Sequence, residues 1–403
     1  MPPAAASPDS AELERLDDAA VEADDTAQMA QNFRFYDNRQ NYLLFVNTCS
    51  EKWVVADRVA REFDLIEPQP PAIRFFDAGV GDGTVAARVM REMHRRFKRY
   101  PFYIAGKEIS LEDIRLFLDK MPDRLFEHPE TVLAITNISY RDAPWLCPKN
   151  EEARERLVWK EVALKGDTTA DFERQIQDLQ PFLAEHWTTK VSEQTGSMIP
   201  ETPTVLVLYR EDCRFLLDHV IPRREAPRAD FDLALASQPF RLRAPVEFKA
   251  RRVLAPLARA LRPGGRLLGI HSAGSDPGME IVQRVWPGED PFDTSRHQIV
   301  EATRDALGDE AGDFLFDPLP AARALFRYEM HTLPDELDRE SASIGTSTLL
   351  AAWNAAVYVA QMDDERVTKA MSSPEYLEAT RAVLRKYGEL WFNDESYVIS
   401  RHR

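Results

Sequence analysis

The chain has 403 residues, 44% of them hydrophobic, and a formal net charge of −16. This length and composition predict one large or two ordinary domains with a sizeable core. The acidic balance weighs against nucleic acid as a partner, because neutralised phosphates supply most of the affinity for DNA or RNA. There is no run of about 18 apolar residues to span a membrane, and the three dispersed cysteines indicate neither a zinc site nor disulfides. We therefore expect a cytoplasmic protein without a metal.

The N-terminal part divides into two segments. Residues 1–28 are rich in Ala, Pro, Asp and Glu, which predicts a disordered acidic lead. Residues 29–66 predict a pair of helices, the second capped by Thr48 or Ser50. We expect 67–403 to form one domain with insertions at about 147–229 and 340–390.

The run RFFDAGVGDGTVAARVM, Arg74 to Met90, predicts a strand, a glycine turn and a helix. Its acid and its alternating glycines are Asp77, Gly79, Gly81 and Gly83. Glycines at such a junction permit the tight turn and let a ligand approach the backbone closely. The dinucleotide pattern G-x-G-x-x-G is not met, because the sixth position from Gly79 is Thr84. The run resembles motif I of the class I S-adenosylmethionine (SAM) dependent methyltransferases.

The next two predicted strands end in polar residues. Phe102 to Ala105 lead to Glu108, and ligands of α/β sheets bind at the carboxyl ends of the strands. The resemblance implies that Glu108 accepts the ribose hydroxyls of the cofactor, whereas a solvated turn carboxylate is the alternative. Val132 to Thr136 lead to Asn137, where the family offers polar groups to the adenine. A plain strand-end Asn in a turn is the alternative.

The fourth predicted strand, FDLALASQPF, ends in Ser237, Gln238, Pro239 and Phe240. The resemblance places motif IV here, beside the transferred methyl group, with Ser237 among the cofactor-binding residues. In enzymes that methylate planar nitrogen, this motif is Asn, Asp or Ser followed by Pro-Pro and Tyr or Phe. Gln238 replaces the first proline, so the tetrapeptide is either a nitrogen-methylation motif or a strand exit that shapes the pocket.

The fifth unit, LAPLARALRPGGRLLGIHS, predicts an amphipathic helix, a turn at Pro263 to Gly265 and a strand over Leu267 to Ile270. ALFRYEMH and the C-terminal ESYVISRHR predict two more strands. The resemblance thus implies an α/β fold with a doubly wound, mostly parallel seven-stranded sheet, an antiparallel last strand and helical insertions. His271 is either a base or a satisfied structural histidine.

The resemblance implies SAM as the cofactor, S-adenosyl-L-homocysteine as the product and in-line methyl transfer, in which the protein mainly positions the reactants. We expect a nitrogen of a small-molecule amine or metabolite to be methylated.

The N-terminal helices have two possible roles. They form a lid whose polar groups, Tyr42 and Lys52 among them, turn inward, or they are part of the core. The insertion at 147–229 either lines the substrate-binding side of the site or only adds to the sheet. The candidate catalytic residues are Gln238, His271, Tyr140 and Tyr36.

Three other functions stay open at this stage. The first is N-methylation of a protein side chain or a base. The second is a dinucleotide-dependent oxidoreductase, and the third is a non-catalytic SAM-binding protein, because intact glycines report binding rather than turnover. The oligomeric state is not predicted.

Overall fold

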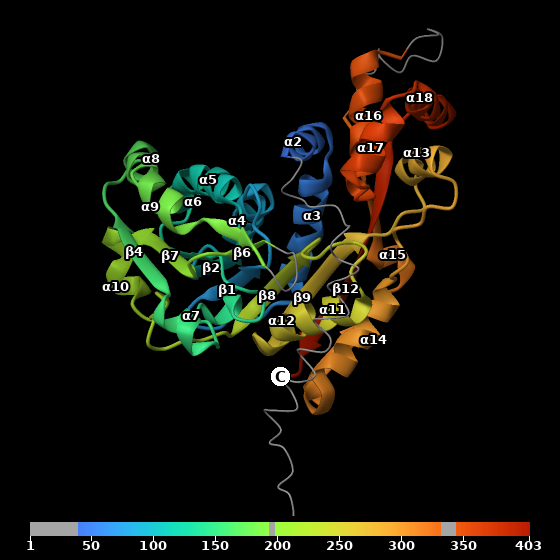
Figure 1. The fold of residues 1–403 in the computed structure, drawn as a ribbon. Coiled ribbons are helices and arrows are strands. Elements are labelled where there is room, and N and C mark those ends of the chain that lie inside the picture. The colour runs from blue at the N-terminus through green and yellow to red at the C-terminus, as the bar shows by residue number, and fades with distance from the viewer. Residues whose placement is uncertain (1–38, 193–197, 332–343) are drawn as a thin grey trace, which may run out of the picture.

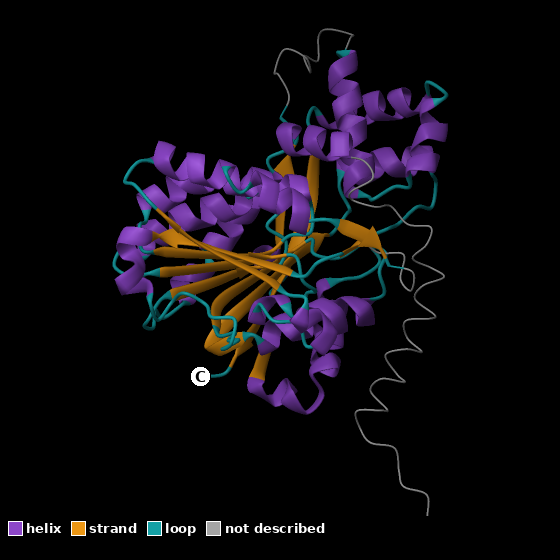
Figure 2. Ribbon diagram, turned by 60° about the vertical axis from the view of Figure 1, so that its left-hand side comes forward, coloured by secondary structure: helices purple, strands orange, loops and turns teal. Residues whose placement is uncertain are grey.

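The computed structural model describes residues 39–192, 198–331 and 344–403. Within these residues a central sheet carries helices on both faces, and further helices gather at one end of the molecule (Figures 1 and 2). None of the described helices combines the length and the apolar character that a membrane crossing requires.

The structure describes twelve strands, ten of which form the central sheet, whereas β5 and β6 form a separate two-stranded sheet. The strands are β1 (Ile73–Asp77), β2 (Phe102–Lys107), β3 (Thr131–Thr136), β4 (Val158–Leu164), β5 (Thr189–Val191), β6 (Met198–Pro200), β7 (Thr204–Arg210), β8 (Phe231–Ser237), β9 (Leu261–Ser272), β10 (Phe314–Asp317), β11 (Leu325–Glu329) and β12 (Trp391–Arg401). The order in the sheet is β10-β12-β9-β8-β1-β2-β3-β7-β4, and β11 also pairs with β12. Strands β3, β2, β1, β8 and β9 are parallel, whereas β12 is antiparallel to β9.

This arrangement confirms the doubly wound α/β fold and the antiparallel last strand, but the sheet has ten strands rather than seven. The additional strands are β4, β7 and β10. Strand β7 pairs with β3 in antiparallel fashion, and β4 follows it at the sheet edge. The sequence VWKEVAL of β4 buries only Leu164, so it lacks the apolar run that marks a central strand.

Helices cover both faces of the sheet. They are α2 (Arg39–Thr48), α3 (Glu51–Ala60), α4 (Thr84–Arg96), α5 (Leu111–Asp119), α6 (Met121–Glu127), α7 (Glu151–Glu155), α8 (Thr169–Gln177), α9 (Gln180–His186), α10 (Arg214–Leu217), α11 (Val246–Lys249), α12 (Ala255–Arg259), α13 (Pro277–Val285), α14 (Arg296–Leu307), α15 (Ala321–Ala324), α16 (Thr346–Val359), α17 (Asp364–Met371) and α18 (Glu375–Tyr387). Helices α3 to α6 share a core with one face of the sheet, and α12 and α14 share a core with the other. Side chains of consecutive residues in a strand point to opposite faces of the sheet. In β1, Phe75 therefore packs in the first core and Phe76 in the second.

A third core joins segments that are far apart in the sequence. Helices α2, α13, α16 and α18 pack there against β11 and the start of β12, and Figure 1 shows α16 to α18 together beside α13. The hydroxyl of Ser50 donates to the carbonyl of Glu329 at 3.2 Å and accepts from its amide at 3.0 Å. Helix α3 does begin after Ser50, but the expected side-chain cap is replaced by this link to β11. The start of α3 is therefore fixed to the C-terminal part of the chain.

The turn expected at Pro263 to Gly265 lies inside β9. The pairing of β8 with β9 shifts register there, and Gly264 has a φ of +77°. A Cβ at Gly265 would lie 2.5 Å from the carbonyl oxygen of Phe231. The two glycines thus allow the pairing of β8 with β9 to continue past this irregularity. The same glycines led to the prediction of a turn from the sequence.

Candidate active site

A cavity of about 740 Å³ opens at the carboxyl ends of β1, β2 and β8. Its lining includes Asp77, Gly79, Gly81, Glu108, Tyr140, Trp187, Ser237 and Gln238, together with Tyr42, Phe45, Glu51, Lys52, Tyr328 and Tyr358. The first group comes from the sheet and the segments around it, and the second from α2, α3, β11 and α16. This is the position at which open α/β sheets bind their ligands.

The acid–glycine run forms one wall of the cavity. The Oδ1 atom of Asp77 accepts from the amide of Gly79 at 3.0 Å. Burial raises the pKa of Asp77 to about 6, against the opposing effects of this hydrogen bond and of Lys52. Gly81 has a φ of +51°, which favours glycine. The run therefore presents a carboxylate and, at Gly79 and Gly81, backbone without side chains to the cavity.

Gly83 has a different structural role from Gly79 and Gly81. It does not line the cavity but precedes α4 with a φ of +80°. A Cβ there would lie 2.8 Å from the Cα of Phe117 on α5. Its need for glycine comes from helix packing, and the structure places it outside the expected cofactor contacts.

Glu108 is buried and links the end of β2 to the glycine run. Its Oε2 atom accepts from the amide of Gly81 at 2.9 Å, and its Oε1 atom accepts from the amides of Ile109 and Ser110 at 2.7 and 2.8 Å. Burial raises the pKa of Glu108, and Asp113 raises it further. The residue is no solvated turn carboxylate. It faces the cavity and also shapes the turn, a role that the sequence does not reveal.

Replacing Glu108 by alanine should reduce both stability and cofactor affinity. One buried and two partly buried amide donors would lose their acceptor, at a cost of about 1–3 kcal/mol in the free energy of unfolding. Urea denaturation of the variant measures this cost. Asp119→Ala, on the exposed surface of α5, is the control, and its free energy of unfolding should stay within about 0.5 kcal/mol of wild type. An unchanged stability in Glu108→Ala would show that these hydrogen bonds contribute little.

The stretch after β8 forms the opposite wall. Gln238 has a φ of +50°, and its Nε2 atom donates to Ser272 Oγ at 2.8 Å and to Asp394 Oδ1 at 3.4 Å. The Tyr140 hydroxyl donates to the carbonyl of Pro239 at 2.8 Å. A positive φ at a non-glycine residue is strained and occurs preferentially at functional sites. Ser237, Gln238 and Tyr140 thus line the same cavity.

Asn137 is not part of the cavity lining. Its Nδ2 atom donates to the carbonyl of Thr202 at 2.9 Å, and its Oδ1 atom accepts from the amide of Thr204 at 2.8 Å. These bonds attach the end of β3 to the start of β7. The side chain has a structural task, which corrects the expectation that it faces the adenine.

His271 is likewise buried away from the cavity. Its Nε2 atom lies 2.9 Å from Glu395 Oε1, and Glu395 Oε2 pairs with Arg296 at 2.6 Å. Burial alone would raise the pKa of Glu395, but His271 and Arg296 hold it at about 2. His271 therefore corresponds to the structural alternative rather than to a base. Tyr36 lies outside the described residues.

The N-terminal helices close over the glycine run through a buried ion pair. Lys52 Nζ donates to Asp82 Oδ1 at 2.8 Å and to the hydroxyl of Tyr42 at 2.9 Å. Burial would raise the pKa of Asp82, but Lys52 and the hydroxyl of Thr84 lower it to about 2. A Cβ at Gly81 would lie 3.5 Å from the Tyr42 hydroxyl. Tyr42 and Lys52 thus turn inward, as the lid interpretation expects.

The far end of the cavity is aromatic and acidic. The rings of Phe45 and Tyr358 stack with centroids 4.8 Å apart, and Tyr328 meets Phe45 edge on at 6.1 Å. Glu51 faces this end. Behind Ser272 and Gln238, burial and then the charge of Glu51 raise the pKa of Asp394 well above its usual range. No sequence motif signals this group, because its members come from segments about 300 residues apart.

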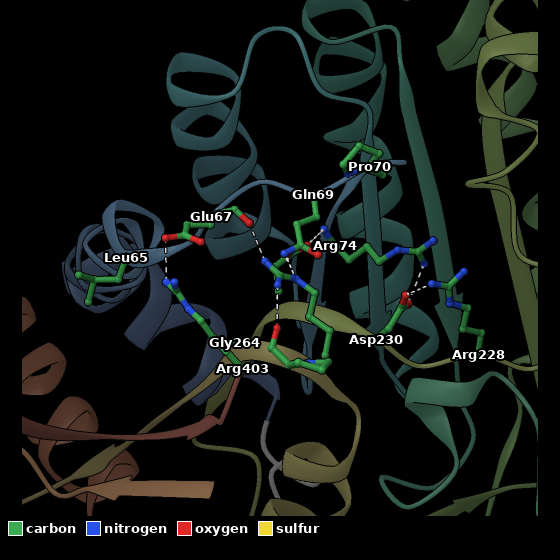
Figure 3. A pocket seen from close by; sticks show the side chains of 13 residues that line it. Leu65, Glu67, Gln69, Pro70, Arg74, Arg228, Asp230, Gly264 and Arg403 are labelled. Atoms are coloured by element: carbon green, nitrogen blue, oxygen red, sulfur yellow. Dashed lines mark hydrogen bonds and ion pairs between the residues drawn. The ribbon is translucent and has the colours of Figure 1, made fainter. Parts of the chain in front are cut away.

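A second pocket, of about 400 Å³, lies at the amino ends of β1, β8 and β9 (Figure 3). Its guanidinium groups are matched by carboxylates. The pairs are Arg74 with Asp230, Arg228 with Asp230, Arg262 with Asp232 and Arg403 with Glu67. These pairs hold the strand starts together and leave little charge for a ligand.

The comparisons with known proteins report similarity to solved structures alone. No protein-family model and no curated protein matches the chain, whereas 95 chains of solved structures do. One is geranyl diphosphate methyltransferase in complex with GPP and sinefungin, at 11% identity and a TM-score of 0.32, covering 86% of this chain and 77% of that one. Another is plantazolicin methyltransferase BpumL in complex with SAH, at 9% identity and a TM-score of 0.33, covering 97% and 99%.

A third is phosphoethanolamine N-methyltransferase 2 of Haemonchus contortus in complex with S-adenosyl-L-methionine, at 11% identity and a TM-score of 0.27. The match covers 87% of this chain and 53% of that one, so the chain spans about half the length of that protein. Likeness at this level assigns no family, and the function rests on the cavity itself.

Proposed function

We propose that the protein is a SAM-dependent methyltransferase that methylates a nitrogen of a small molecule. The observation that carries this proposal is the junction of the acid–glycine run with Glu108 in one cavity, where Gly81 donates to Glu108 at 2.9 Å. The motif IV-like stretch from Ser237 to Phe240 lines the same cavity. A cofactor site and a transfer site therefore share one enclosed space.

The residues present fit SAM. A Cβ at Gly79 would meet no protein atom within 4 Å, so the glycine leaves open space beside the backbone. Asp77 and Glu108 supply buried carboxylates, which suit a cofactor with a net positive charge and ribose hydroxyls. Asp77, Gly79, Gly81 and Glu108 would hold the cofactor, which supplies an activated methyl group on a sulfonium.

The protein's own contribution is positioning and exclusion of water. Tyr140 fixes the carbonyl of Pro239, and Ser272 fixes the side chain of Gln238. This holds the polar groups after β8 rigidly at the cavity wall, where they orient the acceptor nitrogen. The Lys52–Asp82 pair attaches α3 beside the glycine run, so that α3 contributes to the cavity lining.

SAM affinity should depend on the ionisation of Asp77. Its pKa of about 6 means that the carboxylate is charged above pH 6 and neutral below it. Affinity for the cationic cofactor is therefore expected to fall as the pH is lowered through about 6. Lys52 and Glu108 also act on this carboxyl, so Asp77→Asn is the reference. Calorimetric titration from pH 8 to 5 should show the fall in wild type and a flat profile in the variant.

Two measurements test the proposed function. Calorimetry with SAM and with NADH separates methyl transfer from hydride transfer, since only SAM is expected to bind. Transfer of a labelled methyl group to small amines, to a protein extract and to nucleic acid then identifies the acceptor class. NADH binding without SAM binding would overturn the proposal, and SAM binding without transfer to any acceptor would point to a non-catalytic protein.

A further inference from the structure

The aromatic end of the cavity has rings from three elements and one carboxylate among its lining residues. Phe45 comes from α2, Tyr328 from β11 and Tyr358 from α16, and Glu51 stands at the start of α3. We propose that this end binds the acceptor as a cationic amine, with Glu51 as its counter-ion and as the group that takes its proton. This assignment rests on the proposed function, because it names the substrate class and the residue that receives it.

Glu51 is free to serve a ligand. It makes no hydrogen bond or ion pair with any residue in the described parts of the chain. Its neighbour Lys52 is already engaged by Asp82 and Tyr42. A carboxylate that is enclosed by protein and lacks a partner is costly, and a bound cation removes that cost.

The backbone holds Glu51 in place, and the helix that it begins opposes the effect of burial, which raises the pKa of Glu51. The paired hydrogen bonds between Ser50 and Glu329 fix the residue directly before it. Glu51 opens a ten-residue helix, and the positive end of a helix dipole stabilises a carboxylate in the first turn. The carboxylate is therefore positioned before a ligand arrives.

Burial is the main influence on the pKa of Glu51 and raises it, whereas Lys52 lowers it and Asp82 raises it, and these two are paired with each other. Asp394 is fully buried behind Ser272, and its Oδ2 atom has no hydrogen-bond partner. Burial and then the charge of Glu51 raise the pKa of Asp394 well above its usual range, which favours its neutral form. A cation bound beside Glu51 would lower the pKa of Glu51 and so favour its carboxylate. One negative charge next to aromatic rings is the combination that attracts an ammonium, by ion pairing and by cation–π contact.

The transfer step balances with this assignment. The ammonium gives a proton to the Glu51 carboxylate and becomes a neutral amine. Its lone pair forms the new nitrogen–carbon bond while the carbon–sulfur bond breaks, and both electrons of that bond remain on sulfur. The product is a methylated ammonium and a neutral thioether, and the next exchange with water restores the carboxylate.

Binding of choline tests the charge requirement apart from turnover. Its neutral carbon isostere, 3,3-dimethyl-1-butanol, has the same shape without the charge. Calorimetry on the full-length protein should show choline binding at least about tenfold more tightly than the isostere. Glu51→Gln should remove that difference, whereas Asp57→Asn, which deletes an exposed carboxylate from the same helix, should preserve it.

SAM titrations of the same variants separate this inference from the proposed function. Glu51→Gln should bind SAM like wild type while losing turnover of amine substrates. Equal binding of choline and the isostere to wild type, no binding of choline at all, or an unchanged ratio in Glu51→Gln would overturn the inference. In a further outcome, wild type fails to bind SAM but still prefers choline over the isostere in a way that depends on Glu51. That outcome would contradict the proposed function but support the cation site.

Discussion

A valine in place of Gly79 is expected to abolish SAM binding and leave the ligand-free protein folded. An added Cβ would meet no protein atom within 4 Å, and the backbone is not in the left-handed region. The side chain would instead enter the space where we place the cofactor. Calorimetry should therefore detect no binding, while the melting temperature stays close to that of wild type.

Gly312 offers a matched control for this variant. It is exposed in the short helical segment before β10, and a Cβ there also meets nothing within 4 Å. Gly312→Val should bind SAM normally. Normal SAM affinity in a folded Gly79→Val protein would contradict the placement of the cofactor against the glycine run.

The largest loss of stability is expected from Lys52→Met. The side chains of Lys52 and Asp82 are only 14% and 10% exposed, and removing one partner leaves the other charge buried and unpaired. We expect a cost of about 3 kcal/mol in the free energy of unfolding, at the lower end for a buried pair. Lys120 limits the cost, because its Nζ atom stays 3.6 Å from Asp82 Oδ2.

The pH dependence of this cost follows from the lowered pKa of Asp82. A carboxyl whose folded pKa lies below its unfolded value stabilises the protein above the unfolded pKa, here about 4. That contribution is lost as the pH falls through about 2. Urea denaturation should therefore show wild type and Lys52→Met converging between pH 4 and 2.

Lys165→Met provides the comparison for an exposed pair. Lys165 and Glu211 lie 3.7 Å apart with side chains 72% and 52% exposed, and such pairs contribute up to about 1 kcal/mol. A cost for Lys52→Met no larger than that for Lys165→Met would mean that the lid is not held by its ion pair.

The side of the cavity where we place the cofactor was largely predictable as a group of neighbouring residues, because its signals are local. Asp77 and Gly81 lie within one strand–turn–helix unit, and Glu108 follows the next strand. A strand end can be located from the apolar run before it, and parallel strands bring their ends together. Asn137 and His271 also stand at strand ends, but their hydrogen-bond partners lie 65 and 124 residues further along the chain. No local pattern indicates that those partners are there.

The acceptor side was beyond the reach of local patterns. Glu51 lies in an ordinary helical run, and the residue before it pairs with Glu329, which is far away in the sequence on the strand that contains Tyr328. The aromatic residues of the N-terminal segment were predicted to be either lid or core. Phe45 is buried in the third core and also lines the cavity, so the core interpretation does not exclude contact with a ligand.

The separation of the two sides along the chain has a consequence for biosynthesis. A nascent polypeptide that has emerged as far as Ser272 already contains Asp77, Gly79, Gly81 and Glu108. Tyr328, Tyr358 and Asp394 are still to be made, as is β12, which lies between β9 and β10 in the sheet. The growing chain must keep the edge of β9 unpaired until its last eleven-residue strand arrives, and an unpaired edge invites association with other chains. The edge of β9 is thus covered only after β12 has been made, later than every residue of the cavity that comes from β1, β2 and β8.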